Sequence, residues 1–522
     1  MKSIICALCA CALADAVALP HYGDPNQGYD RIPGTRPTPH FAWMKPAAGG
    51  PLKTLFILPY NRSRAVVEFG QRIDVEPTWI MTAGVAVRTQ AYREGSIATP
   101  LFDREADLVL EKIMKERLLD RSRKYDAIVI GKVSWDVFNP DEKAEILRRV
   151  REDGTGLVYF GPNRYARREN KGGIGAGASG ELTAPDRDFE SVLGAYDASV
   201  AETILKGVPV DALPLAPNPD HAKVLTDRDR SWPNARVEMG VWIGTARLGK
   251  GRVVAVDYQE NESKPCGWTD AVAFSAKLPN GWFDWTAYDY AYEMAARALL
   301  VAVGRADQLK TTVKIEAPRL APRLEWDMKL AAKPLESGLW KNPPDRDLVI
   351  KHPVTTVWRG DLAKCKVKVE GGEGNAMVTI RDRDGRAVGV PQRLDLSNPS
   401  NLSNFSNLSL KRGDYFVCVQ AKDGDGKVKD FASAAFRVET DVRITDLATE
   451  RKHYGAGETI RGGFALTRAL KPDERVEVTA RDTWGRLVFE SEELKVKSEK
   501  SGNGGTFEIP VKDALSRLWM SA

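Results

Sequence analysis

Apolar and polar residues follow two different periods along the chain, and the change comes near residue 305. Before it, short apolar runs closed by Gly, such as 125–131 and 156–161, alternate with segments such as 105–119, whose apolar residues recur at helical spacing. Apolar runs of this length are typical of parallel strands buried on both faces. The alternation predicts a mostly parallel sheet with helices on both faces for residues 51–305.

The stretch between the two apolar runs carries the signals of a helix. Asn139 is a favoured N-cap residue, and Pro140 suits the first helical position. Asp141 and Glu142 face the positive end of the helix dipole, and Gly154 supplies the stop. Strand, helix and strand together predict a βαβ crossover.

The rest of the chain has the period of half-buried strands. Residues 365–369 alternate Cys or Val with Lys, which places the apolar side chains on one face. The motif at 380–388 returns at 480–488, an offset of 100 residues. The repeat predicts two all-β immunoglobulin-like sandwiches in tandem, over residues 306–440 and 441–522.

The second sandwich is expected to be incomplete. Its last strand, 518–520, corresponds to 415–419 of the first copy, which continues with a turn and one more strand at 433–438. A sandwich without its last strands has an exposed edge and an open core. We therefore expect either that the chain is a fragment of a longer protein or that a partner completes it.

The N-terminus has the pattern of an export signal. Lys2 precedes an apolar run that is too short for a membrane anchor and is followed by small residues, which predicts a signal peptide over 1–18. The protein is then periplasmic, secreted or on the cell surface, with no transmembrane anchor after cleavage. Lipidation at the box 8–11 is the second interpretation. Residues 19–50, rich in Pro and Gly, predict an extended linker.

Charge and composition exclude several classes of partner. The 76 basic and 71 acidic residues are interspersed, so no strong field attracts a nucleic acid. Five scattered histidines and no His/Cys cluster with ligand spacing argue against a metal, and no cofactor is expected.

The first domain resembles the class I glutamine amidotransferase-like superfamily, above all its secreted amidotransferase-like proteins and the middle domain of β-galactosidases. The resemblance rests on residues 125–130 with the helix that follows, 202–214 and 249–258. It implies an α/β flavodoxin-like fold, here with a long insertion at 163–236. In active members a Cys on a tight strand-to-helix turn attacks the substrate, and a later His with a nearby Glu completes the triad.

This chain departs from that pattern at the nucleophile. The corresponding turn reads Gly161-Pro162-Asn163-Arg164, which offers no thiolate. The remaining cysteine of the domain is Cys266, and its local histidine, His221, precedes it, the reverse of the family order. We therefore expect a domain without catalytic activity, and a Cys266-dependent amidohydrolase is the alternative.

Polar residues at the carboxyl ends of the predicted strands are candidates for ligand binding, because open α/β sheets bind ligands there. They are Asn61, Arg62, Arg64, Ser134, Trp135, Asn163, Arg164, Asp257 and Glu260. Such a set could hold a sugar, with stacking on Trp135; the alternative is that these are solvated loop residues and that Trp135 covers the core. Asp257 and Glu260 could also form an acid/base carboxylate pair, against ordinary charged loop residues.

Two cysteines fall on strands of the first sandwich. The order and spacing of Cys365 and Cys418 resemble the inter-sheet disulfide of immunoglobulin domains, although the intervening Trp is missing. Export would allow oxidation. A disulfide and two separately buried thiols both remain open.

These patterns favour an exported multidomain protein whose amidotransferase-like domain acts in recognition or scaffolding, with a carbohydrate or an envelope protein as partner. One alternative is a carbohydrate-active enzyme with its site at the strand ends or in a missing downstream domain. The other is the Cys266-dependent amidohydrolase.

Overall fold

The computed structural model forms two compact units. Unit 1 takes in most of the chain up to Arg437, and unit 2 consists mainly of Val438–Ala522. The structure describes, with short internal gaps, residues 41–82, 110–160, 198–209, 236–258, 272, 285–328, 348–490 and 503–521. The predicted signal peptide and most of the predicted insertion lie outside the described residues.

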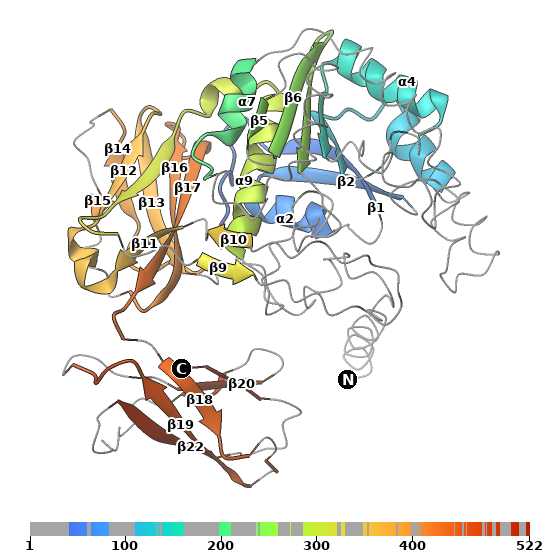
Figure 1. Cartoon of the computed structure of the whole chain (residues 1–522). Coiled ribbons are helices and arrows are strands. Elements are labelled where there is room, and N and C mark those ends of the chain that lie inside the picture. The colour runs from blue at the N-terminus through green and yellow to red at the C-terminus, as the bar shows by residue number, and fades with distance from the viewer. Residues whose placement is uncertain are drawn as a thin grey trace. The chain divides into compact units, whose positions relative to one another are not determined.

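Unit 1 contains a mixed, mainly parallel sheet of seven strands in the order β2-β1-β3-β4-β7-β6-β5 (Figure 1). The neighbours from β2 to β7 pair parallel, and β6 and β5 are antiparallel additions at one edge. The strands are β1 (Leu52–Pro59), β2 (Val75–Thr82), β3 (Ala127–Gly131), β4 (Gly156–Phe160), β5 (Arg236–Glu238), β6 (Val241–Leu248) and β7 (Gly251–Tyr258). The mostly parallel sheet predicted from the apolar runs is confirmed.

The central strands are apolar because both of their faces are covered. Every residue of β3 and β4 is buried. A Cβ on Gly156, which begins β4, would lie 2.6 Å from the carbonyl oxygen of Ala302. Only a residue without a side chain fits where the end of a helix lies against the sheet.

The helices of this sheet are α2 (Arg64–Arg72), η3 (Lys115–Leu119), α4 (Pro140–Arg148), η5 (Arg149–Asp153), α7 (Ala198–Leu205) and α9 (Trp285–Ala302). The predicted helix between β3 and β4 is confirmed: Asn139 and Glu142 form a reciprocal capping box, and Pro140 is the first helical residue. Gly154 ends η5 with φ +80°, as its expected role as a stop requires.

The first sandwich follows in the same unit, after the short helix η8 (Ala306–Gln308). One sheet has the order β11-β17-β16-β13-β14 and the other β15-β12-β8. Their strands are β8 (Thr312–Glu316), β11 (Thr355–Trp358), β12 (Lys366–Glu370), β13 (Asn375–Asp382), β14 (Gln392–Asp395), β15 (Ser403–Asn404), β16 (Gly413–Lys422) and β17 (Val428–Glu439). The helix η9 (Arg359–Lys364) precedes β12, and β9 (Glu325–Met328) pairs with β10 (Leu348–Lys351).

Unit 2 has two sheets of three strands each, β18-β19-β22 and β21-β20-β23. The strands are β18 (Ile444–Thr449), β19 (Thr459–Leu466), β20 (Thr479–Asp482), β21 (Leu487–Glu490), β22 (Gly504–Pro510) and β23 (Leu518–Ser521). Its described core is small and comes mostly from β19 and β22, including Ile460, Phe464 and Phe507. The antiparallel pairing of both β regions agrees with the predicted change of period.

Candidate functional site

The carboxyl ends of the parallel strands meet at one edge of the large sheet, as the sequence predicted. β1 ends at Pro59, β3 at Gly131 and β4 at Phe160. Arg64 begins α2 and Asp257 pairs with Trp242 across β7 and β6, but the positions of these side chains are not described. Six of the predicted binding residues lie outside the described residues: Asn61, Arg62, Ser134, Asn163, Arg164 and Glu260.

Trp135 is a core residue, which corrects the prediction that it stacks on a ligand. Its side chain is 2% exposed, and its ring lies 5.4 Å from Phe138 and 6.5 Å from Tyr159, centroid to centroid. The hydroxyl of Tyr159 donates to the carbonyl oxygen of Val133 and fixes the same corner. Because its faces are covered by protein, the indole cannot stack on a sugar, and the alternative that it covers the core is correct.

The cysteines of the first sandwich are free thiols, so the disulfide suggested by their spacing is not formed. The Cys418 Sγ accepts a hydrogen bond of 3.1 Å from the Nε of Arg381, and the Cys365 Sγ donates to the carbonyl oxygen of Asp361 at 3.3 Å. Burial raises the pKa of Cys418 to about 11 and also raises the pKa of Cys365. A raised pKa favours the protonated thiol, which is the weaker nucleophile. Cys266 and His221 lie outside the described residues.

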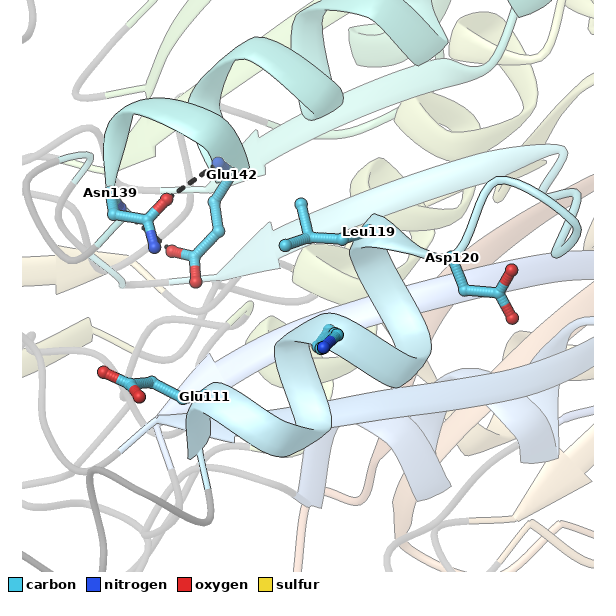
Figure 2. A pocket seen from close by; sticks show the side chains of 6 residues that line it. Glu111, Leu119, Asp120, Asn139 and Glu142 are labelled. Carbon is cyan, nitrogen blue, oxygen red and sulfur yellow. Dashed lines mark hydrogen bonds between the residues drawn. The ribbon is translucent and has the colours of Figure 1, made fainter.

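An open surface depression of about 640 Å³ lies beside the start of α4 (Figure 2). It is lined by Glu111, Lys115, Leu119, Asp120, Asn139 and Glu142. Figure 2 shows Asn139 and Glu142 turned toward each other, where each side chain accepts from the other's backbone N–H at 2.9 Å. Hydrogen bonds from Ser122 hold the pKa of Asp120 below its usual range. These polar groups complete the helix and its neighbouring turn, and no group of three metal-binding side chains occurs among the described residues.

Away from this depression, buried polar groups of unit 1 gather where the sheet domain meets the first sandwich. Residues 41–50, which we name the strap, run between them. Met44 exchanges backbone hydrogen bonds with Arg72 and Asp74, and Ala48 donates to the carbonyl of Val428 in β17. Trp43 is fully buried and its ring lies 5.3 Å from that of Phe431, with an interplanar angle of 12°. The last part of the predicted extended linker is therefore an ordered part of the fold.

A network of four buried charged side chains lies near the strap, and we name it the ionic joint. It consists of Glu68, Arg72, Asp289 and Arg381. Arg72 pairs with Glu68 at 2.5 Å and with Asp289 at 3.1 Å, and Asp289 also accepts from Arg381 of β13. None of these side chains is more than 3% exposed. Two positive and two negative groups balance, so burial leaves no net charge.

The electrostatics of Arg72 show how the ionic joint offsets the cost of burial. Burial lowers the pKa of Arg72, but the carboxylates of Glu68 and Asp289 outweigh it and leave the pKa raised. The guanidinium also lies over the ring of Tyr292, 4.8 Å from its centroid. Arg72 is thus charged, and its contacts hold it in place where the sheet domain meets the first sandwich.

A second polar cluster links α9 to β17. The Ser433 hydroxyl donates to Glu293 at 2.6 Å, and Arg297 donates to the same carboxylate at 2.9 Å. One turn earlier, the hydroxyl oxygen of Tyr290 accepts from the backbone N–H of Ala435 at 2.8 Å. Figure 1 shows α9 beside β17, whose Ser433 and Ala435 donate bonds to the helix.

These clusters were not among the predicted sites, although the sequence of α9 carries a signal for them. Its only charged residues are Asp289, Glu293 and Arg297, spaced by four on a helix that is otherwise apolar or aromatic apart from Thr286. Residues four apart lie on one helix face, so the pattern indicates a polar stripe that must find buried partners. The partners themselves come from α2, β13 and β17, which no local pattern connects to α9.

Two further findings concern membrane-spanning helices and protein families. Among the described helices none has the length and apolarity needed to cross a membrane. No protein-family model matches the chain, and no curated protein does so.

Three solved structures are similar to parts of the chain. A tetra-tandem repeat from the extending region of a large adhesion protein is 17% identical with a TM-score of 0.16, over 30% of this chain and 40% of that one. The alpha-2-macroglobulin of E. coli is 16% identical with a TM-score of 0.16, over 38% and 13%. The FN1–FN3 domains of chicken CNTN1 are 11% identical with a TM-score of 0.11, over 30% and 62%. The chain spans less than two thirds of each, and at these TM-scores the likeness carries no argument about fold or function.

Proposed function

We propose that the protein is an exported recognition or scaffolding protein whose amidotransferase-like domain does not hydrolyse amides. The observation that carries the proposal is the end of β4 together with the sequence that follows it. That strand ends at Phe160 in the middle of the parallel sheet, and the next residues are Gly161-Pro162-Asn163-Arg164. In the superfamily that the sequence resembles, the nucleophilic thiol follows directly after such a strand, and here these four residues include no cysteine.

The strand order supports the flavodoxin-like assignment on which this reading depends. The parallel strands run β2-β1-β3-β4-β7, and counting only these the order is 2-1-3-4-5. That is the flavodoxin-like order of doubly wound sheets, which bind ligands at the carboxyl ends of the strands beside the crossing point. A ligand of this domain would therefore lie near the ends of β1 and β3.

The ionic joint supports a scaffolding role. It fixes the sheet domain to the first sandwich through the buried contact of Asp289 in α9 with Arg381, and the second cluster adds the contact of Glu293 with Ser433. Buried paired charges require good geometry, so the two parts hold one relative orientation. A fixed pair of domains presents a defined surface to a carbohydrate or an envelope protein, the partner class that export implies.

The test is an assay of ammonia release from glutamine by the whole protein. We expect no release above the buffer blank, in the native protein and in Cys266→Ala alike. Release that disappears in Cys266→Ala but persists in Cys365→Ala would contradict the proposal and establish the amidohydrolase. A glycan array then tests the partner class, and an array without any binder would leave an envelope protein as the partner.

A further inference from the structure

The strand β2 lies at one edge of the large sheet, and its outer side carries backbone groups that do not bond to the sheet. Among the described strands, β1 alone pairs with β2, along its whole length of 8 residues. The N–H of Leu52 donates to the carbonyl oxygen of Asp74 at 2.9 Å, so the even-numbered residues that follow direct their backbone groups toward β1. The backbone groups of the other residues point outward, and these are Val75, Pro77, Trp79 and Met81.

Three of these four outward positions lack a backbone group that an added strand would need. The N–H of Val75 donates to the carbonyl oxygen of Ile73 at 3.0 Å, and Pro77 has no N–H. The carbonyl oxygen of Trp79 accepts a hydrogen bond from the Nη1 of Arg117 in η3. The outer side of β2 is therefore interrupted at two successive positions in the middle of the strand.

The middle of β2 is nevertheless at the surface of the protein. Glu76 and Pro77 are exposed, and Trp79 is 45% exposed. The guanidinium of Arg117 also lies over the ring of Trp79, 5.7 Å from its centroid, so that one side chain contacts both the ring and the carbonyl of this residue. A long edge strand at the surface pairs readily with other chains unless proline or a charged side chain blocks it, and β2 has both.

We propose that Pro77 and Arg117 are an autoinhibitory pair, which prevents β2 of one copy of this protein from pairing antiparallel with β2 of a second copy. The second copy is the partner that the edge fits, because two identical edges related by a two-fold axis offer each other the same backbone groups. In such a pair each outward residue exchanges its N–H and C=O with the residue opposite. The missing N–H of Pro77 and the engaged carbonyl of Trp79 therefore each remove a hydrogen bond from both copies. The inference concerns β2 alone and is independent of the proposed function.

The double variant Pro77→Val, Arg117→Met of the whole chain tests the proposal. Val supplies the missing N–H, and Met keeps the aliphatic part of the arginine side chain without its donors. Sedimentation equilibrium should show self-association about tenfold tighter in each single variant and about 100-fold tighter in the double variant, because each change restores one hydrogen bond per copy. In the double variant, hydrogen exchange at the Trp79 amide should become slower as the protein concentration rises.

Arg121→Met is the matched control, since Arg121 pairs with Glu145 at 3.1 Å and its replacement should leave self-association unchanged. Self-association of the double variant no tighter than that of the native protein would overturn the proposal. Concentration-dependent protection of the Trp79 amide in the native protein would also overturn it, because the edge would then be paired already.

A peptide probe keeps the proposal testable if the double variant does not fold. The peptide has the sequence of residues 74–82 with Pro77→Val, and it is mixed with the native protein and with the single variant Arg117→Met. We expect it to bind that variant about fivefold more tightly, since one carbonyl of the protein becomes available. Equal binding to the two proteins would show that Arg117 does not block the edge.

Discussion

Asp289 joins two guanidinium groups that are far apart in the sequence, Arg72 from the sheet domain and Arg381 from the first sandwich. Replacing it with Asn keeps the shape of the side chain but removes the negative charge that the two cations share. We expect Asp289→Asn to lower the free energy of unfolding of unit 1 by about 3–5 kcal/mol, the usual cost of leaving a buried charge without its partner. Urea unfolding of the two proteins measures it.

Glu373→Gln provides the matched control for that variant. Glu373 pairs with Lys310 at 3.8 Å but is 82% exposed, so its loss should change the free energy of unfolding by less than about 1 kcal/mol. A loss in Asp289→Asn no larger than in Glu373→Gln would show that the ionic joint does not hold unit 1 together.

Single residues were the hardest feature to predict from the sequence. The sequence allows two interpretations of Trp135, because an aromatic residue after a strand can face a ligand or the core. The positions of Phe138 and Tyr159 decide between them. Cys365 and Cys418 likewise have immunoglobulin-like spacing, but each thiol has its own partner. Side-chain direction depends on tertiary neighbours, which spacing along the chain does not encode.

At the scale of elements, α4 depends on its capping box. Asn139 accepts from the backbone N–H of Glu142 at 2.9 Å. Asn139→Ala should lower the free energy of unfolding by about 1 kcal/mol, whereas Asn139→Asp, which keeps the acceptor, should retain stability. Equal losses in the two variants, measured by urea unfolding, would contradict the role of the cap.

The other end of α4 predicts a dependence on acid. Burial raises the pKa of Glu145, but hydrogen bonds and charges from Arg148 and Arg149 outweigh it and leave the pKa lowered. Since the unfolded chain then binds the proton more tightly, the contribution of Glu145 is present above about pH 4.3 and is lost as the pH falls through the lowered folded value.

Free energies of unfolding between about pH 3 and pH 6, the range of ordinary carboxyl titration, test this dependence. Glu145→Gln should be less stable than the native protein at neutral pH and should lose less stability on acidification. Glu116→Gln is the control, since Glu116 is 55% exposed and 3.9 Å from Lys112. An unchanged acid slope in Glu145→Gln would contradict the assignment.

Elements were predictable where one local signal dominated. The parallel strands, the helix between β3 and β4 and the change of period near residue 305 all followed from apolar patterns and capping residues. The strap has the high Pro and Gly content of a linker, so its composition predicts a linker. Its order comes from backbone bonds to Arg72 and Val428, which lie far along the chain.

At the scale of the whole molecule, the boundary predicted between residues 305 and 306 does not separate two independent bodies. The ionic joint and the strap connect the sheet domain to the first sandwich within unit 1. We expect the amides of β3 and those of β16 to lose protection from hydrogen exchange together on addition of denaturant, because they open in one cooperative step. Asp289→Asn should shift both by the same amount and leave β19 of unit 2 unchanged.

Sandwich amides that stay protected while the sheet domain exchanges freely would contradict that coupling. The sequence could predict two kinds of domain and their order, because each has its own period. It could not predict that buried contacts join them, because the sequence of α9 shows its polar residues but not their partners in the sandwich.

The central claim is that the sheet domain presents no reactive thiol to a glutamine-like substrate. An electrophilic glutamine analogue, which alkylates the nucleophilic cysteine of a glutamine-hydrolysing enzyme, tests it directly through the intact mass of the protein. We predict no adduct under native conditions. An adduct that maps to Cys266, and that is absent in Cys266→Ala and in the unfolded protein, would contradict the account.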